Sequence, residues 1–482
     1  MENRKTFKIM MISLCVYMLL SWVIVAGNFQ SNNYTNSGFN QFGLFDFLLA
    51  PINVFNTFVV SLSLNIDDYV RQFSYGNIIV ALISIAIYYG VLNKTDAYYN
   101  LVITVRNKFK NKRKALLIIT AITYYLVSAF SGLFLILFLF FPFICAVLTK
   151  LKFNKETIAF STIGAMLIGQ IGSVYNPSIN GIARILFSTE INNYVLPRII
   201  LSIILLLIVI AVILFKENQD TDKVVATLLL EEKDTKKLKK ESYIPIIIVT
   251  LVSTIILFIC MYNWYYMFDI KKITNTYNTI TNFSVKNYKF MNNIFGISEP
   301  FGYWTGFTMS GLLLLSSLVI KFLYKIKFND MLDNCRKAVK RITPVVFYSI
   351  ISLSIIVIAL NNSDSFIYSI INNIFKINNH IISLLLACIV HNIFINDYFA
   401  LLSSLSEPIK SIFDIDKLNL SLLITQVSHG ISSLITPFNI YLIAGLTYLN
   451  ISFKSWFKYI WKIVLLLLLI CLIILYVIST FM

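Results

Sequence analysis

Two proline-centred motifs carry the polar residues that are best placed to bind a solute. They lie at 169–184 and 426–445. When the prolines are aligned, each motif has a serine four residues earlier, a polar residue directly before the proline and an asparagine shortly after it. The residues concerned are Ser173, Asn176, Pro177 and Asn180 in the first motif, and Ser433, Thr436, Pro437 and Asn439 in the second.

Proline in a helix removes one hydrogen bond and frees a carbonyl. Freed carbonyls and hydroxyls are suitable ligands for a sodium ion, here near Ser173 and Ser433, and the start of a half-helix attracts a carboxylate. The alternative is a pair of simple kinks in which Ser, Thr and Asn restore the backbone hydrogen bonds. Because the two motifs match, we favour a substrate and ion site.

A few ionisable residues lie near these motifs. Arg184 follows Pro177 by seven residues, and it either faces an anion or extends to the outer interface, since a charge within a span is costly. His429 and His391 either move protons or make hydrogen bonds within the packing. Asp397 either binds a cation or a proton or caps a half-helix. These alternatives remain open at the level of sequence.

Several catalytic motifs are missing from the sequence. It contains neither a Walker A sequence nor an H-E-x-x-H motif, so we expect no ATP motor and no zincin-type protease. The six cysteines are far apart and form no C-x-x-C pair. The sequence thus predicts a protein that is not an enzyme and has no cofactor, with sodium or proton coupling as the open possibility.

The composition is that of a polytopic membrane protein. Hydrophobic residues make up 58% of the 482 residues and charged residues 13%, against roughly 25% charged in a typical soluble domain. Soluble enzymes and nucleic-acid binders are therefore excluded. The net charge of +17 is explained by Lys and Arg in short loops between apolar segments, which is typical of membrane topology.

The hydrophobic pattern predicts an all-α fold with nine crossings, two of them broken, and two re-entrant hairpins. A span needs about 20 residues, and the broken helices at 157–187 and 417–447 are too long for one straight helix. The hairpins at 115–150 and 380–408 have small or polar residues in the middle. The seven unbroken crossings are expected at 8–26, 77–93, 195–215, 244–262, 302–320, 343–361 and 456–480.

Lys and Arg counts support this topology. With a cytoplasmic N-terminus and an external C-terminus, cytoplasmic segments carry 29 of the 40 basic residues and outside segments 8. This asymmetry is the positive-inside rule. We expect a multi-pass protein of the cell membrane with a retained first helix.

The order of elements divides the chain into two similar halves. The first half is 1–215, followed by a charged cytoplasmic linker at 216–243, a connecting helix and extracellular loop at 244–301, and a second half at 302–482. The odd helix at 244–262 inverts the second half, so the two hairpins are expected to open on opposite sides. Inverted repeats with interrupted helices indicate a secondary transporter.

Four stretches resemble the YfcC-type, DcuC-like C4-dicarboxylate carrier permeases of the ion transporter superfamily. They are G-L-F-D-F-L-L-A-P-I at 43–52, I-G-S-V-Y-N-P-S-I-N-G-I-A at 171–183, Q-V-S-H-G-I-S-S-L-I-T-P at 426–437 and L-N-I-S-F-K-S-W-F-K-Y-I-W at 449–461. The resemblance implies the inverted-repeat fold, a homodimer and a hairpin-bearing unit that moves as an elevator.

The departures from the family pattern lie at the hairpins. Leu135 and Ile136 stand where the family usually has two acids, and His429 stands where it has an Asp. These substitutions leave the solute undetermined. We expect a secondary-active transporter for a small carboxylate-bearing solute such as an amino acid, dicarboxylate or peptide. A channel or facilitative uniporter on the same fold is the alternative, motivated by the loss of both hairpin carboxylates.

Overall fold

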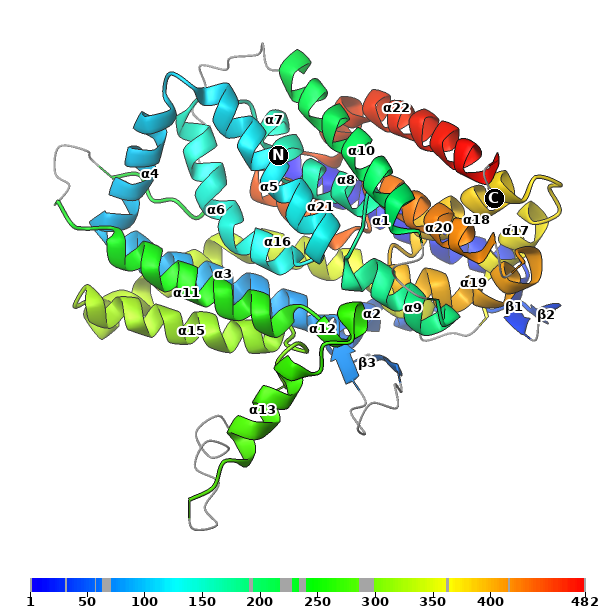
Figure 1. Ribbon diagram of the computed structural model, residues 1–482, viewed down its shortest axis with the longest axis horizontal. Coiled ribbons are helices and arrows are strands. Elements are labelled where there is room, and N and C mark those ends of the chain that lie inside the picture. Colours follow the sequence, from blue (N-terminus) through cyan, green and yellow to red (C-terminus); the bar gives the residue numbers. More distant parts are fainter. Residues whose placement is uncertain are drawn as a thin grey trace.

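The computed structural model is a bundle of helices (Figure 1). It describes residues 2–30, 33–56, 58–62, 71–189, 194–216, 228–233, 240–285, 299–360, 364–414 and 417–480. The first half contains α1 (Glu2–Val23), α2 (Leu44–Asn56), α3 (Gly76–Lys94), α4 (Asp96–Phe109), α5 (Arg113–Ser131), α6 (Phe134–Lys150), α7 (Lys155–Ala159), η1 (Phe160–Gly164), α8 (Ala165–Ile171), η2 (Pro177–Gly181), α9 (Ile182–Phe187) and α10 (Val195–Lys216). The rest contains α11 (Ile244–Met261), α12 (Trp264–Phe268), α13 (Lys272–Asn282), α15 (Gly306–Leu323), α16 (Phe328–Leu360), α17 (Phe366–Ile374), α18 (His380–Phe394), α19 (Tyr398–Ile412), α20 (Leu418–Ser433), α21 (Ile440–Tyr448) and α22 (Phe453–Thr480).

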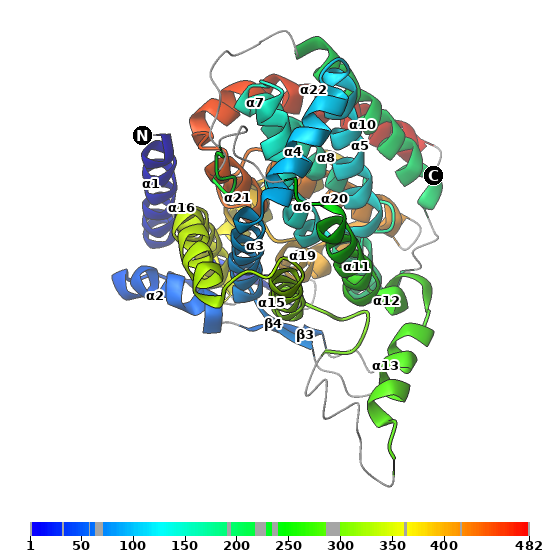
Figure 2. The ribbon, with the colours of Figure 1, turned by 90° about the vertical axis from the view of Figure 1, so that its left-hand side faces the viewer.

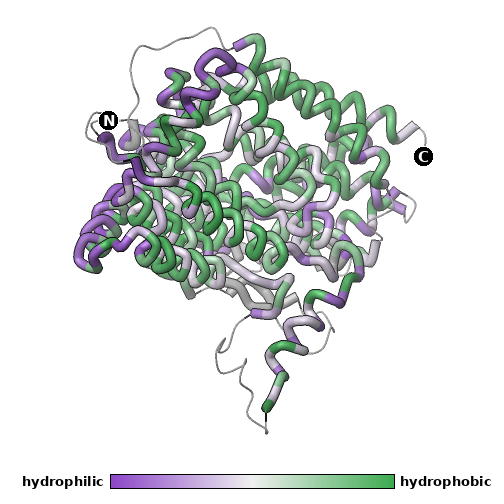
Figure 3. Tube along the Cα trace, turned by 60° about the vertical axis from the view of Figure 1, so that its left-hand side comes forward, coloured by the Kyte–Doolittle hydropathy of each residue, from purple (hydrophilic) through white to green (hydrophobic). Residues whose placement is uncertain are grey.

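Within the described residues, eight helices are long and apolar enough to cross a membrane. Seven of them coincide with the seven unbroken crossings that the sequence predicts, although α16 begins well before residue 343. The eighth is α5, which the sequence assigns to a hairpin. The prediction of an all-helical, polytopic membrane protein is confirmed. Figure 3 shows apolar residues along most of the bundle and hydrophilic residues gathered toward its ends.

Helices differ in how much of their surface is buried. The central helix α3 is buried on nearly all sides and packs against α15 and α16. By contrast, α10 and α22 bury one stripe and expose apolar side chains such as Leu207 and Leu469. An apolar surface of this kind is suited to lipid. Figure 2 shows α1 and α2 at one side of the bundle, next to α16.

Two helix pairs stand in place of the predicted hairpins. The first pair, α5 and α6, is joined at Gly132, whose φ of 63° suits a residue without a Cβ. The second pair, α18 and α19, is joined by residues 395–397. In Figure 1 the two pairs approach from opposite ends of the bundle. Whether they are re-entrant in a bilayer stays a prediction.

Short strands and long-range contacts tie the two halves together. Two antiparallel hairpins, β1 (Ala26–Gln30) with β2 (Asn33–Gly38) and β3 (Phe58–Leu62) with β4 (Arg71–Ser74), are additions to the expected all-α pattern. Strand β1 continues to the second half, because Gly27 N donates to Ser365 O at 3.3 Å and Ser365 N donates to Gly27 O at 3.1 Å. Near the N-terminus, Thr6 Oγ1 accepts a hydrogen bond from Phe453 N at 3.1 Å.

Part of the predicted solvated linker is docked on the bundle. Residues 228–233, here called the linker strap, place Leu229 in the core with 1% exposure. Asn93 Nδ2 donates to Leu229 O at 2.6 Å, and Glu232 pairs with Lys150 at 2.6 Å. The apolar run Leu228–Leu230 explains the docking, because it would be costly to leave in water. The remaining linker residues, 217–227 and 234–239, lie outside the described residues.

The predicted extracellular loop at 263–300 contains two helices, α12 and α13, among its described residues. Residues 286–298 of that loop lie outside the described part of the chain.

Candidate functional site

The first broken helix is interrupted between α8 and η2. Asn176 closes the break: its Oδ1 accepts from Ser178 N at 2.9 Å, and its Nδ2 donates to Ser128 O at 3.3 Å. Asn180 Nδ2 donates to Val174 O at 2.6 Å. Pro177 occupies the first position of the following helical segment, where a missing N–H leaves no hydrogen bond unmade.

The second broken helix is interrupted between α20 and α21, and its hydrogen bonds follow a similar plan. Asn439 Oδ1 accepts from Leu442 N at 2.8 Å, so it caps α21, while its Nδ2 donates to Asn396 Oδ1 at 2.8 Å. Thr436 Oγ1 donates to Ile393 O at 2.8 Å.

In both halves, therefore, the residue before the proline donates to a carbonyl in the last turn of the first hairpin helix: Asn176 to α5 and Thr436 to α18. Each break is attached to the hairpin of its own half.

The two broken helices also cross each other. Gln426 Nε2, on α20, donates to Ile171 O and Ser173 O, both at 2.9 Å. These carbonyls lie at the end of α8, where backbone acceptors lack partners within the helix. Gly430 lies directly against Ile171. A side chain from the second half thus stabilises the helix break of the first.

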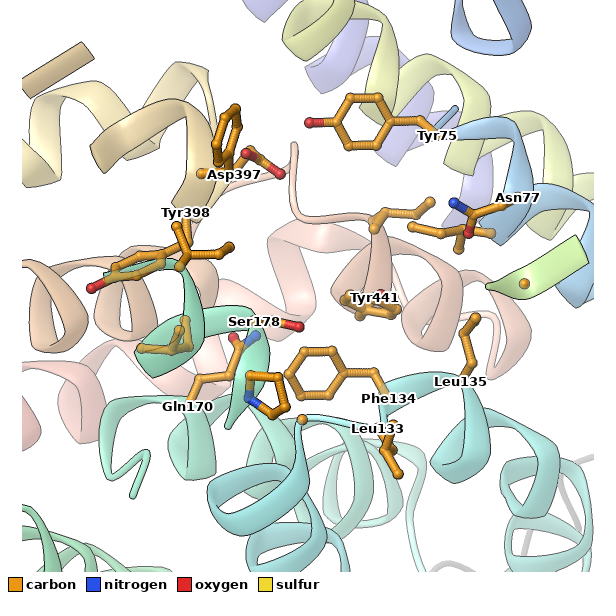
Figure 4. A pocket seen from close by; sticks show the side chains of 18 of the residues that line it. Tyr75, Asn77, Leu133, Phe134, Leu135, Gln170, Ser178, Asp397, Tyr398 and Tyr441 are labelled. Carbon is orange, nitrogen blue, oxygen red and sulfur yellow. The ribbon is translucent and has the colours of Figure 1, made fainter. Parts of the chain in front are cut away.

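A pocket of about 340 Å³ lies where the two breaks and the two hairpin turns meet (Figure 4). Four helical segments begin at its wall: α6, η2, α19 and α21. Its lining comprises Tyr75, Asn77, Ile78, Gly132, Leu133, Phe134, Leu135, Gln170, Pro177, Ser178, Ile179, Ile182, Met261, Asn263, Trp304, Thr305, Gly306, Leu353, Ile356, Asn396, Asp397, Tyr398, Phe399, His429, Asn439, Ile440 and Tyr441.

The charge of the pocket wall is unusual for a site expected to take anions. Among the described lining residues, Asp397 is the only carboxylate, and neither Lys nor Arg is present. Asp397 Oδ1 accepts from Ala400 N at 2.8 Å and so caps α19. His429 Nδ1 is hydrogen-bonded to Asn392 Oδ1 at 2.8 Å. Any attraction for an anion must come from helix starts rather than from cationic side chains at the wall.

Of the residues predicted from sequence, Pro177, Asn439, Asp397 and His429 line the pocket. The others among the two motifs are not among the lining residues: Ser173, Asn176, Asn180, Ser433, Thr436 and Pro437. All of them except Pro437 are buried.

Ser433 Oγ donates to His429 O at 2.8 Å. The buried Ser173 hydroxyl has no hydrogen-bond partner among the described residues. Of the two predicted sodium ligands, the Ser433 hydroxyl therefore already makes a hydrogen bond, whereas the Ser173 hydroxyl makes none among the described residues.

Arg184 and His391 lie away from the pocket wall. Arg184 Nη2 pairs with Asp269 Oδ1 at 2.9 Å, and the Asp269 side chain is 66% exposed. Arg184 is thus not among the residues that line the pocket, and its partner is an exposed acid. Of the two readings of Arg184 from the sequence, this position favours extension toward the outer interface. His391 is fully buried, with Nε2 3.2 Å from Ser404 Oγ.

Several pocket residues were not predicted, notably Tyr75, Gln170, Ser178 and Tyr441. Gln170 and Ser178 belong to the first motif, and Tyr441 follows Asn439 by two residues, so proximity to the breaks was an available signal. Tyr75 directly precedes α3, far from either motif, and nothing in its local sequence marks it.

This arrangement, a bundle of membrane-spanning helices with two interrupted helices around an internal pocket, defines a membrane transporter. The family model described as the C4-dicarboxylate anaerobic carrier, DcuC, matches residues 4–480. The chain belongs to this family, which confirms the resemblance inferred from the motifs.

Among solved structures, the chain is similar to the YdaH transporter of Alcanivorax borkumensis, whose crystal structure is described as having an unusual topology. The two share 12% identity over 99% of this chain and 98% of that one, with a TM-score of 0.40. No curated protein sequence matches the chain.

Proposed function

We propose that the protein is a secondary-active carrier of small carboxylates, foremost C4-dicarboxylates, and that the pocket is its solute site. The observation that carries this proposal is the meeting of helical starts at one wall. The start of α19 is already capped by the Asp397 carboxylate, so the starts of α6, η2 and α21 are the ones that face a solute. The first N–H groups of a helix lack partners within it, and its start carries roughly half a positive charge. Such starts attract carboxylates without a cationic side chain.

An elevator movement is the mechanism that we propose. Wall residues come from two groups of elements. Asn77, Trp304 and Leu353 belong to the part built around α3, α15 and α16, whereas Gln170, Asp397 and Tyr441 belong to the hairpins and broken helices. A pocket at this boundary would move from one side of the membrane to the other when the hairpins and broken helices slide past the part built around α3, α15 and α16. We further propose a homodimer, in which the first group is the fixed scaffold.

Coupling to sodium, or plain exchange, is part of the proposal. Ser173 supports a sodium site, because its buried hydroxyl has no partner among the described residues. A proton carried by His429 or Asp397 is the alternative. Uptake that requires sodium and falls in Ser173→Ala supports the first; sodium-independent uptake with a steep pH dependence supports the second.

The proposal is tested by uptake of radiolabelled succinate into proteoliposomes. Gln170→Ala should lower uptake about tenfold with little change in melting temperature, because Gln170 lines the pocket in which the proposed solute binds. Gln41→Ala, at an exposed glutamine, is the matched control.

Unaltered uptake in Gln170→Ala would argue against this pocket. Unitary currents in a planar bilayer, in place of saturable uptake, would show that the protein is a channel and would overturn the proposal that it is a carrier.

A further inference from the structure

The electrostatics of the pocket wall do not match a plain dicarboxylate. Asp397 is the only carboxylate among the described lining residues, and no Lys or Arg lies beside it. Arg198 is buried in α10 and is not among the lining residues, although it interacts electrostatically with Tyr398 of the wall. A doubly negative solute would be held next to the Asp397 carboxylate, whose charge is balanced only by hydrogen-bond donors and the start of α19.

One carboxylate oxygen of Asp397 lies outside the helix cap and can accept a hydrogen bond from a ligand. Its Oδ1 caps α19 through Ala400 N at 2.8 Å, which leaves Oδ2 outside that cap. Figure 4 shows the carboxylate and the Tyr75 hydroxyl pointing toward one another. The Tyr75 side chain is only 5% exposed, and its hydroxyl has no hydrogen-bond partner within bonding distance among the described residues. The Tyr75 hydroxyl is thus placed to donate to the Asp397 carboxylate, whose remaining lone pairs can accept from a donor that enters the pocket.

Aromatic rings complete this side of the pocket. Tyr75 and Trp304 line it, and Tyr441 lies between Asp397 and the opposite side, with its ring centroid 5.0 Å from that of Phe134. A carboxylate beside aromatic faces is the environment that an ammonium group favours, through ion pairing and cation–π attraction. Leu133, Phe134 and Ser178 lie across the pocket from Asp397 and Tyr75 in Figure 4, at the starts of α6 and η2. A carboxylate is suited to that opposite side.

We propose that Asp397, with Tyr75 and Tyr441, holds an ammonium group, so that the preferred solute is a carboxylate that also carries an ammonium group: an α-amino acid, the amino-substituted C4-dicarboxylate included. This inference rests on the proposed function, since it assigns the two ends of the same solute site. His429 is the other titratable side chain of the wall besides the tyrosines, and its Nδ1 is occupied by Asn392.

The test compares three ligands that share one carbon skeleton: L-aspartate, succinate and N-acetyl-L-aspartate. Binding to the purified full-length protein is measured by thermal stabilisation at pH 7.5, and uptake is measured in proteoliposomes. We expect L-aspartate to bind at least tenfold more tightly than the two ligands that lack an ammonium group. Asp397→Asn should abolish that preference, because it should weaken the binding of L-aspartate and leave the binding of succinate unchanged.

Asparagine is itself a good helix cap, so Asp397→Asn keeps the start of α19. Asp269→Asn, at an acid outside the pocket, is the matched control and should keep the preference. Tyr75→Phe, which removes only the hydroxyl, should weaken aspartate binding severalfold and leave succinate unchanged.

Each other outcome is decisive. Succinate binding as tightly as aspartate in the wild type would overturn the ammonium site while leaving a dicarboxylate carrier intact. Succinate binding that tightens toward pH 5.5 in the wild type but not in Asp397→Asn, without any aspartate preference, would show that Asp397 takes a proton instead. Absence of binding by all three ligands would overturn both this inference and the proposed function.

Discussion

At Gly430 the two broken helices approach more closely than any side chain allows. A Cβ added there would lie 2.5 Å from Ile171 Cγ1 and 2.8 Å from the Ile171 backbone nitrogen. The neighbouring Gln426 holds the end of α8 through two hydrogen bonds of 2.9 Å. Glycine at this position therefore sets the distance between the two helix breaks, and with it the shape of the pocket.

We expect Gly430→Ala to destabilise the protein by about 1–3 kcal/mol, the range for overpacking a tight core, and to impair uptake. The melting temperature in detergent and succinate uptake are the measurements. Gly311→Ala, also in a helix, is the control: nothing lies within 4 Å of an added Cβ there. This control should leave uptake unchanged and stabilise the protein by about 0.5–1 kcal/mol, as is usual when alanine replaces an unstrained glycine within a helix. Equal stability of the two variants would show that the two broken helices can move apart at their crossing without a loss of stability.

At the scale of elements, the two helix pairs that meet at the pocket define how the site is reached. They approach from opposite ends of the bundle in Figure 1, and their turns both line the pocket. Lys152, beyond the end of α6, and Lys410, in the last turn of α19, are both exposed. If the pairs are re-entrant hairpins of an inverted repeat, these two positions lie on opposite sides of the membrane.

Cysteine labelling in intact cells checks this prediction. In a background that lacks the exposed Cys15, Lys152→Cys should react only with a membrane-permeant maleimide, while Lys410→Cys should also react with an impermeant one. Reaction of both positions with the impermeant reagent would contradict the inverted arrangement.

The sequence located the helix breaks well because proline acts locally. Pro177 and Pro437 lie within the two breaks or at their ends, where the missing N–H of proline disfavours a continuous helix, and the capping asparagines lie within three residues. What the sequence did not reveal depends on distant partners. Gln426 binds carbonyls 253 and 255 residues away, and Tyr75 reaches the pocket only because α3 packs at its edge. The alternatives for Arg184 stayed open for the same reason, since Asp269, its partner, is 85 residues further along.

At the scale of the whole molecule, the linker strap connects parts that the pocket separates. Leu229 N donates to Tyr448 Oη at 3.3 Å, at the end of α21, while Asn93 of α3 binds Leu229 O. Glu231 pairs with Arg341 of α16 at 3.0 Å. Exposed ion pairs contribute little, about 0–1 kcal/mol each. Burial of Leu229 therefore provides most of the attachment.

Leu229→Ala should lower stability by about 2–5 kcal/mol, as for other fully buried leucines, and make the strap sensitive to proteases. Limited proteolysis and thermal melting measure both effects. Leu228→Ala, at a half-buried neighbour, should cost less. A strap that stays protected in Leu229→Ala would show that its polar contacts suffice.

The contacts between the two ends of the chain impose an order on biosynthesis. Thr6 meets Phe453 across 447 residues, and at a translation rate of about 5–20 residues per second the second partner emerges roughly 20–90 s after the first. Strand β1 likewise waits for Ser365. Helix α1 is thus inserted early and completes its packing late, when α22 leaves the ribosome. The two halves of the chain are therefore not independent folding units, because α1 packs against α22 and strand β1 pairs with Ser365.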